Sequence, residues 1–396
     1  MQRVCDLHIH SKYSGGTSNN INLLEIAKNC KIKGINIVGT GDCLYPLWLR
    51  ELRNNLVEYN SGIYYLHQIP EVNFILQTEV EIIWVVKSQM KKAHFIILLP
   101  NFERLEEISE FLSLYGRLNF NGRPKLNISA ENFVLGLKSI DSSIEIIPAH
   151  IFTPYFGILG NKLKFKSIIE GLGQATAYIH AIETGLSADP SMIRMVSELN
   201  RFTIISNSDA HSTQFHRLGR EATVLSINKL TYQNIIATIK SNKIDKTYEF
   251  KPSEGKYYYD GHRSERHSNG IDYYCSPKRK KKKCPYCGKA LTKGVLSRVY
   301  ELSDQEPNLN LNYQYIVPLL HLISVVLGGT EYSYKNLSLY QKLVKNNDGE
   351  YKIWNGSKNF EGIPEKLITA IYKIQKGNYY FLPGHDGIYG KLQLEV

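Results

Sequence analysis

Seven short apolar runs in residues 1–245, each followed by polar residues, constrain this chain more than any other feature. They are predicted strands at 4–9, 35–38, 74–76, 95–99, 144–147, 181–183 and 203–205. Several are flanked by segments whose apolar residues recur every three to four positions, as in helices packed on a sheet. We therefore expect a parallel α/β layout, and about seven such units favour a barrel over an open sheet.

Side chains of metal-binding types stand at the ends of nearly all these runs. His8 and His10 stand at the end of the first run, and residues two apart in a strand face the same side, so both imidazoles can reach one point. Asp209 and His211 repeat this spacing after the seventh run. In barrels of parallel strands, chemistry gathers at the carboxyl ends of the strands. The eight candidate ligands are His8, His10, Asp42, Glu79, His94 (at the start of the fourth run), His150, Asp209 and His211.

A single histidine at a strand end is more often a hydrogen-bonded core residue than a ligand, but the joint pattern predicts a metal centre. All candidate ligands offer nitrogen or oxygen, which suits Zn²⁺, Mn²⁺, Fe²⁺ or Mg²⁺ without choosing between them. Several ligand pairs predict two or three ions. Such a cluster can generate hydroxide near neutral pH and hold the attacking and leaving oxygens of a phosphodiester. The residues alone therefore predict a metal-dependent phosphoesterase.

Positive charge is concentrated in residues 251–300, which carry thirteen Lys or Arg against four Asp or Glu and so hold nine of the eleven excess charges. A basic segment in an otherwise balanced chain indicates a polyanion partner, with nucleic acid ahead of an anionic membrane. The run 278–283 can also be a solvated loop. Its candidate phosphate contacts are Lys280, Lys281, Lys282 and Lys283.

Two arginines just beyond the Asp209–His211 pair, Arg217 and Arg220, are candidates for gripping the phosphates beside the scissile bond. The alternative is an ordinary ion pair, for example between Arg220 and Glu221.

Cys284 and Cys287 form half of a zinc site, because thiolates two residues apart at a tight turn can share one tetrahedral ion. Cys275 is the expected third ligand and His262 the fourth, with His267 as the alternative. Four protein ligands would make this Zn²⁺ structural, holding a segment too small to bury its own core. The other reading is a reduced, metal-free hairpin. The remaining cysteines are expected to pack as small buried residues: Cys5, Cys30 and Cys43.

At 396 residues the chain is too long for one ordinary core, and we expect three parts. They are a catalytic domain at 1–245, a basic zinc-binding domain at 246–294 and a C-terminal, mainly helical region at 295–396 that is expected to bind DNA. Helical spacing is found at 295–302, 315–327, 337–344 and 364–375, and a short strand is expected at 391–396.

Composition excludes several classes of protein. With 43% hydrophobic and 21% charged residues, the chain is neither disordered nor fibrous. Its longest apolar run, 315–327, is too short to span a bilayer, so no membrane partner is expected. The first residues carry no export signal, and six unevenly spaced cysteines indicate a reducing compartment. We expect a cytoplasmic, nucleoid-associated protein.

This arrangement of ligands resembles the PHP (polymerase and histidinol phosphatase) superfamily. The resemblance implies a distorted seven-stranded barrel with a site for two or three metal ions. It assigns the first ion to His8, His10 and Asp209, the bridge to Glu79, the second ion to His94 and His150, and a third ion to Asp42 and His211. Many members have another histidine shortly after the first pair, where this chain has Ser11, Lys12, Tyr13 and Ser14. The implied catalytic residues are His8, His10, Glu79, Asp209 and His211.

Longer motifs are similar to those of the endonuclease Q family, over nearly the whole chain. They lie at 38–42, 78–81, 148–154, 185–189, 206–212 and 216–221. The resemblance implies a zinc-binding insert, a C-terminal helical region and cleavage of DNA on the 5′ side of deaminated bases (hypoxanthine, uracil, xanthine) and abasic sites. It implies a 3′-hydroxyl and a 5′-phosphate as products, with repair or replication proteins as further partners.

Two other functions are weighed against this one. A small-molecule phosphatase of the histidinol-phosphate-cleaving type would leave the zinc insert and the basic segment without a purpose. A non-catalytic nucleic-acid-binding protein does not need the complete set of ligands.

Overall fold

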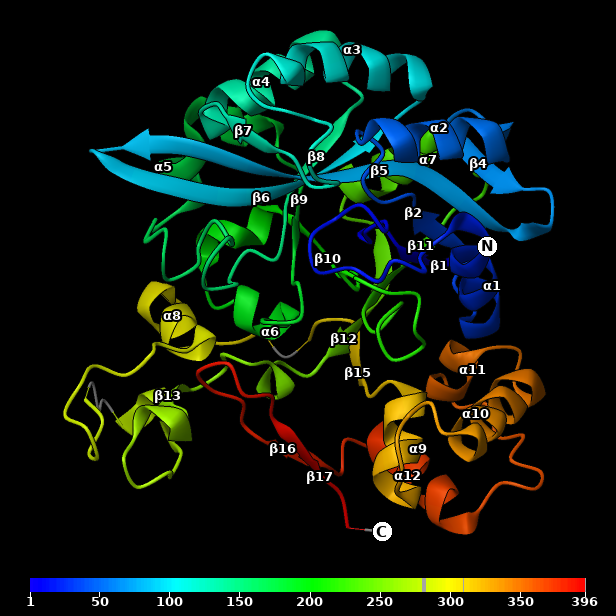
Figure 1. The fold of residues 1–396 in the computed structure, drawn as a ribbon, viewed down its shortest axis with the longest axis vertical. Coiled ribbons are helices and arrows are strands. Elements are labelled where there is room, and N and C mark those ends of the chain that lie inside the picture. Colours follow the sequence, from blue (N-terminus) through cyan, green and yellow to red (C-terminus); the bar gives the residue numbers. More distant parts are fainter. Residues whose placement is uncertain (280–282, 309, 396) are drawn as a thin grey trace.

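The computed structural model describes residues 1–279, 283–308 and 310–395 (Figure 1). Its centre is a mixed sheet of eleven strands, and a separate pair, β9 and β10, lies beside it. The strands of the large sheet are β1 (Gln2–Asp6), β2 (Ile37–Gly39), β3 (Leu56–Asn60), β4 (Ile63–Leu66), β5 (Ile69–Val86), β6 (Gln89–Leu99), β7 (Lys125–Asn127), β8 (Glu145–Pro148), β11 (Ala222–Ser226), β12 (Ile244–Phe250) and β15 (Tyr313–Ile316). The pair is β9 (Ala181–Glu183) with β10 (Thr203–Ile205).

The predicted α/β class is confirmed, but the strands are not all parallel. β1, β2 and β5 are parallel neighbours, as expected. β6, however, pairs antiparallel with both β5 and β8, and β11 pairs antiparallel with β1. The cause is local: β5 and β6 are joined through Lys87 and Ser88, both at positive φ, which is the backbone of a two-residue hairpin turn. In place of the predicted seven parallel strands, the structure has a mixed sheet of eleven strands and the separate pair β9–β10.

Helices cover the sheet, and Figure 1 shows α3 and α4 on the side of the long β5–β6 hairpin. The helices of this part are α1 (Leu23–Lys33), α2 (Pro46–Asn55), α3 (Phe102–Ser113), α4 (Ala130–Ile140), α5 (Ile168–Leu172), α6 (Pro190–Ile193) and α7 (Tyr232–Lys240). Side-chain caps start several of them: Asn22, Asn101 and Ser129 each accept a bond from a backbone N–H in the first turn. Short 3₁₀ turns lie at Gly173–Tyr178, Ser197–Arg201, Pro252–Glu254, Ser264–Arg266 and Pro277–Arg279.

After the sheet, the chain forms a small hairpin and then a group of helices. The hairpin is β13 (Asp260–His262) with β14 (Tyr273–Cys275), and a second one near the C-terminus is β16 (Tyr380–Leu382) with β17 (Lys391–Gln393). The helices are α8 (Val295–Leu302), α9 (Leu319–Leu327), α10 (Tyr334–Asn346), α11 (Glu350–Trp354) and α12 (Glu365–Gln375). The predicted helix at 315–327 divides into β15 and α9 at Pro318, which caps α9.

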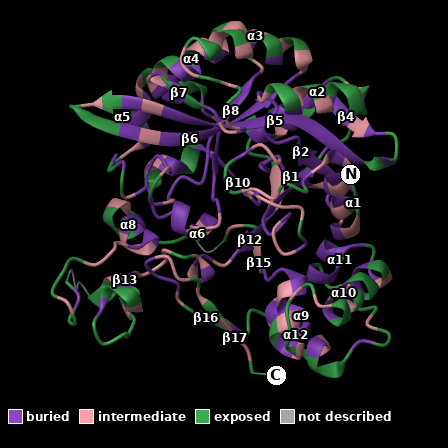
Figure 2. Cartoon of the chain, viewed as in Figure 1, coloured by how far each residue is buried: buried purple, intermediate pink, exposed green. Residues whose placement is uncertain are grey.

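One hydrophobic core takes in side chains from the whole length of the chain, including Phe74, Leu322 and Ile371. Figure 2 shows this buried material running through the sheet and the helices around it. β12 crosses residue 245, and β15 pairs with it in parallel, so a strand from the C-terminal region extends the sheet that carries the site. Within the described residues, no helix is both long enough and apolar enough to cross a bilayer.

Candidate metal centre and active site

His8, His10 and Asp209 come together where the chain leaves β1 and β10. His10 Nε2 lies 3.2 Å from Asp209 Oδ1, and His8 Nε2 lies 3.6 Å from the same oxygen. In the part of the chain that the structure describes, these three atoms are buried and make no hydrogen bond. Buried polar atoms without partners are costly, so atoms that converge on one point in this way fit a metal ion between them.

A second group is formed by Glu79, His94 and His150. Glu79 Oε1 lies 3.0 Å from His94 Nδ1 and 3.1 Å from His150 Nε2. His94 was expected at the start of a strand, but it lies inside β6, opposite Glu81 of β5. The strand is longer than predicted because the hairpin with β5 extends it backwards to Gln89.

Glu79 stands between the two groups. Its Oε1 is 3.6 Å from His8 Nε2, and its Oε2 is 3.3 Å from His10 Nε2. Ligand atoms around an ion bound at about 2.1 Å lie about 3.0 to 3.5 Å apart, which is the spacing seen here. The six residues thus offer two adjoining ion sites with one carboxylate shared between them.

Carboxylates behind the histidines fix which ring nitrogen faces the site. His8 Nδ1 donates to Glu183 Oε1 at 3.0 Å, and His10 Nδ1 donates to Asp42 Oδ1 at 2.9 Å. An ionised carboxylate only accepts, so each ring, when neutral, carries its proton on Nδ1 and has the Nε2 lone pair for a metal. Glu183 also accepts bonds from Asn207 and from the backbone N–H of His150. Glu183 was not among the predicted site residues, although it ends a predicted strand as the ligands do.

Among the described residues, the two predicted ligands of a third ion, Asp42 and His211, are not brought together. Both oxygens of Asp42 have partners, because Oδ2 accepts from the backbone N–H of Ser11 at 2.6 Å and from its hydroxyl at 2.7 Å. Asp42 therefore orients His10. Among the described residues, Asp42 and His211 belong to no common group of ligand atoms. His211 instead donates from Nδ1 to the backbone oxygen of Asp209 at 2.9 Å.

The carboxylates of Glu79 and Asp209 are ionised. Burial alone would raise the pKa of Glu79, but His94, His8 and Arg123 hold it well below its ordinary value. Burial would also raise the pKa of Asp209, and its neighbouring histidines hold that pKa well below the ordinary value too. Both groups are thus available as charged ligands at neutral pH.

A cavity of about 340 Å³ opens beside the two ligand groups. Its lining combines predicted site residues, cationic groups and aromatic rings. These are, in that order, His94, His150, Asp209 and His211; Arg123, Arg220 and Lys256; and Phe156, Phe250, Tyr257, Tyr258 and Tyr389. Cationic and aromatic groups together suit a ligand that is both anionic and flat.

The two predicted phosphate-gripping arginines differ in position. Arg220 is buried in the cavity wall, where its Nε donates to the backbone oxygen of Ser208 at 3.0 Å. The alternative ion pair with Glu221 is not seen in the described structure, because that carboxylate accepts from Thr184 and from the backbone of Leu186 and Phe250. Arg217 lies further out and is hydrogen-bonded to the Tyr389 side chain.

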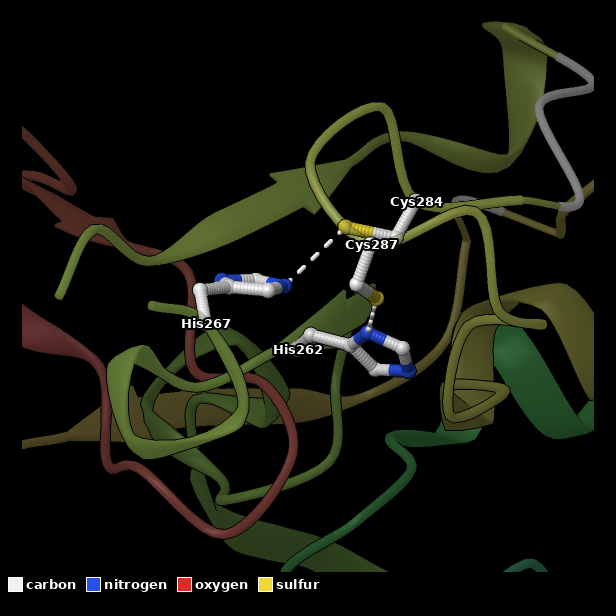
Figure 3. Close-up of side chains that lie close together, drawn as sticks. All are labelled: His262, His267, Cys284 and Cys287. Atoms are coloured by element: carbon white, nitrogen blue, oxygen red, sulfur yellow. Dashed lines mark hydrogen bonds between the residues drawn. The ribbon is translucent and has the colours of Figure 1, made fainter. Parts of the chain in front are cut away.

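The cysteine pair lies beside two histidines (Figure 3). Cys284 Sγ is 3.0 Å from His267 Nε2, and Cys287 Sγ is 3.5 Å from His262 Nδ1. The predicted ligand Cys275 lies outside this group, and both histidines belong to it. Cys275 is paired with Asp260 in the β13–β14 hairpin, while His262 is paired with Tyr273, so Cys275 stands two residues further along the strand.

Both histidines present a lone pair to the thiols. His262 Nε2 donates to the backbone oxygen of Ala290 at 2.8 Å, and His267 Nδ1 donates to that of Ile271 at 2.7 Å. A carbonyl only accepts, so each ring, when neutral, carries its proton on the nitrogen that faces the carbonyl and has its lone pair on the nitrogen that faces Cys287 or Cys284. Two thiols and two imidazoles oriented in this way match a tetrahedral zinc site with backbone carbonyls behind its histidines.

The basic run 278–283 directly precedes Cys284 in the sequence. Lys280, Lys281 and Lys282 lie outside the described residues, so their predicted phosphate contacts stay a prediction. Lys283 is exposed and forms a β-bridge with Ala290. The other cysteines are fully buried, as expected for small core residues: Cys5, Cys30 and Cys43.

No family model matches the chain. An uncharacterized protein of Methanocaldococcus jannaschii is 30% identical over 294 residues, which is 70% of this chain and 36% of that protein, so the match spans about a third of its length. An uncharacterized protein of Bacillus subtilis is 28% identical over 413 residues and covers 98% of each chain.

Two crystal structures are similar over the whole chain. One is the lesion-specific endonuclease EndoQ of Pyrococcus furiosus, with a TM-score of 0.87 and 31% identity over 100% of this chain and 96% of that one. The other is endonuclease Q bound to a 27-mer duplex with an abasic lesion at its active site, again with a TM-score of 0.87 and 31% identity, over 100% and 97% of the two chains.

Proposed function

Because the chain belongs to the endonuclease Q family and is a metal-dependent DNA endonuclease, we propose that it cuts DNA on the 5′ side of deaminated bases and abasic sites. Hypoxanthine, uracil and xanthine are the proposed bases, and a 3′-hydroxyl and a 5′-phosphate the proposed products. The observation that carries the proposal is the pair of ligand groups sharing Glu79 and opening onto a cationic, aromatic cavity.

The chemistry is hydrolysis of one phosphodiester. The oxygen of a water molecule bonds to phosphorus, the bond from phosphorus to O3′ breaks, and O3′ takes up a proton. Divalent ions held by the six ligand residues supply charge neutralisation and a lower pKa for water. His211 lies at the edge of the cavity and uses Nδ1 on a backbone oxygen, so its Nε2 is left to take the proton from the attacking water.

A damaged base must leave the DNA base stack before its chemical groups can be recognised, and in our proposal it enters this cavity. A deaminated base pairs poorly, so it is cheaper to extrude than a normal one, and this difference contributes selectivity. In our proposal the base lies against the aromatic rings of Tyr257, Tyr258 and Tyr389, while Arg220 faces its phosphate.

We assign a structural Zn²⁺ to His262, His267, Cys284 and Cys287. The ion would hold the segment that bears the basic run near the DNA backbone, where lysines give affinity without reading sequence. A cytoplasmic, nucleoid-associated location and contact with other repair proteins belong to the same proposal.

The test uses labelled duplexes that carry uracil, hypoxanthine or an abasic site, with Mg²⁺, Mn²⁺ and Zn²⁺ supplied separately. We expect a nick 5′ of the lesion and no nick in undamaged DNA.

Asp209→Ala should bind the lesion duplex but cut it at less than about a hundredth of the wild-type rate, because a ligand of the centre is lost. Release of phosphate from a small phosphomonoester without any nicking would overturn the proposal in favour of a phosphatase.

A further inference from the structure

The loop that follows α3 enters the metal centre at the place where the sequence predicts a third ion. The Gly122 N–H donates to the backbone oxygen of Tyr13 at 2.9 Å. A Cβ atom added to Gly122 would lie only 2.6 Å from Asp42 Oδ2 and 2.7 Å from Ser14 Oγ. The backbone of this glycine therefore fills the space beside Asp42.

Among the described residues, the side chains around Asp42 already use their polar atoms on one another. Asp42 uses both oxygens on His10 and Ser11. Ser14 follows the first histidine pair, and its hydroxyl lies 3.2 Å from His10 Nδ1. Protein atoms thus take up the position and the bonding capacity that a third ion would need.

The next residue, Arg123, brings a positive charge to the same place. Its Nη1 donates to Glu79 Oε2 at 2.9 Å, and its side chain lines the cavity. Asp42 and Asp209 lie close enough to stabilise its charge. A guanidinium has five N–H donors, and in the described part of the chain Glu79 is its hydrogen-bond partner.

We infer that the catalytic centre of this chain holds two ions and that Arg123 supplies, in place of a third, the cation that binds the scissile phosphate. This inference rests on the proposed function. Guanidinium is planar and permanently charged, so it can donate two parallel bonds to phosphate oxygens. Negative charge grows on those oxygens as water attacks, and a fixed donor at that point stabilises the transition state more than the bound substrate.

The first measurement is the metal content of the whole protein, by elemental analysis after reconstitution with Mn²⁺. We expect two Mn²⁺ and one Zn²⁺ per chain in the wild type. Arg123→Ala should keep both Mn²⁺ and lose about a hundredfold to a thousandfold in single-turnover cleavage of a lesion duplex, as when one oxyanion donor is removed. Sub-denaturing guanidinium ion should restore part of that rate.

Arg117→Ala is the matched control, because Arg117 is an exposed guanidinium of the same loop, outside the cavity lining. It should cut like the wild type. Arg123→Lys keeps the charge but not the planar fork, and it should fall between the wild type and Arg123→Ala. This milder variant also covers the case in which Arg123→Ala fails to fold.

Three results would overturn the inference. The first is a third Mn²⁺ in the wild type. The second is loss of a Mn²⁺ in Arg123→Ala, because Arg123 would then only position Glu79. The third is an unchanged cleavage rate in both Arg123 variants. A wild-type protein that cuts no lesion duplex would instead refute the proposed function, and the metal count would still test the number of ions.

Discussion

At the scale of single residues, the site depends on side chains that lie behind the candidate ligands. Glu183 is fully buried, accepts from His8 Nδ1 and is itself held by Asn207 and by the backbone N–H of His150. Glu183 therefore fixes which ring nitrogen of His8 carries the proton, and it also holds the backbone of His150, which belongs to the other ligand group. Such partners of metal-bound histidines matter nearly as much as the ligands.

Replacing Glu183 by Ala should weaken binding of the ion held by His8 about tenfold to a hundredfold, the usual cost of losing a residue that orients a ligand. Titration of the metal-free protein with Mn²⁺ measures this loss. Glu183→Gln keeps an oxygen that can accept from His8, so it should lose less than Glu183→Ala. Equal Mn²⁺ affinity in all three proteins would show that Glu183 only fills space.

Six of the eight candidate ligands lie in the two groups of ligand atoms, and their meeting could be predicted because each one follows or lies in a strand, where spacing along the chain determines which way the side chain faces. Glu183 and Arg123 could not be assigned in this way. Each acts through a residue far away in the chain, His8 for the first and Glu79 for the second. No local pattern encodes such a pairing.

At the scale of elements, the candidate zinc site draws its ligands from the β13–β14 hairpin and from the segment that follows it. His262 ends β13, His267 lies in the loop between β13 and β14, and the cysteine pair follows the basic run. A segment of this size buries little apolar surface, so a bound ion would supply much of its stability.

Substitutions of the four candidate zinc ligands test this set. His267→Ala and the double change of Cys284 and Cys287 to Ser should each remove one Zn²⁺ per chain and raise amide exchange in residues 251–300. Cys275→Ser is the matched control and should keep the ion, since Cys275 lies outside the group. Zinc lost from Cys275→Ser and kept by His267→Ala would restore the ligand set predicted from the sequence.

Element positions were more predictable than element directions. All seven expected strands have counterparts, and the helix at 295–302 has the predicted bounds. The direction of β6 was not predictable, because Lys87 and Ser88 carry no Asn-Gly signal for the tight turn that they form. This turn of two residues therefore reverses β6 relative to β5, while β11 is antiparallel to β1 independently of it.

At the scale of the whole molecule, the C-terminus completes the active-site cavity. The turn at 384–390 is joined to residues 253–256 by backbone bonds from Gly384 to Ser253 and from Gly390 to Glu254, each 2.9 Å long. A Cβ on Gly390 would lie 2.3 Å from the Ser253 oxygen, so the close approach requires glycine. This contact holds Tyr389 at the cavity.

Tyr389→Ala should therefore weaken binding of a lesion duplex about tenfold or more, the effect of one base–aromatic stack. Tyr389→Phe keeps the ring and should bind nearly as well as the wild type. Tyr380→Ala removes an exposed tyrosine of β16 that does not line the cavity, and it should change nothing. Fluorescence anisotropy with damaged and undamaged duplexes gives the affinities, and an equal loss for both would contradict a role in base recognition.

The helices α9 to α12 form a group on the α1 side of the molecule (Figure 1). One buried ion pair joins them to α1, with Lys33 Nζ 3.0 Å from Glu350 Oε2 of α11. Lys33 also donates to the backbone oxygen of Phe215 at 2.6 Å, near the arginines beside the cavity. Glu350 accepts further bonds from the Leu319 backbone and from the Tyr340 hydroxyl.

Lys33→Met should lower the free energy of unfolding by about 3 to 5 kcal/mol, because it leaves the Glu350 carboxylate buried without its counter-ion. Lys31→Met is the matched control. Lys31 pairs with Glu71 at 2.6 Å, but both side chains are more than half exposed, so its loss should cost less than about 1 kcal/mol. Adding Glu350→Gln to Lys33→Met removes the unpaired charge and should recover part of the stability. Urea denaturation of the four proteins measures these differences, and equal losses for Lys33→Met and Lys31→Met would mean that the buried pair does not hold the C-terminal helices in place.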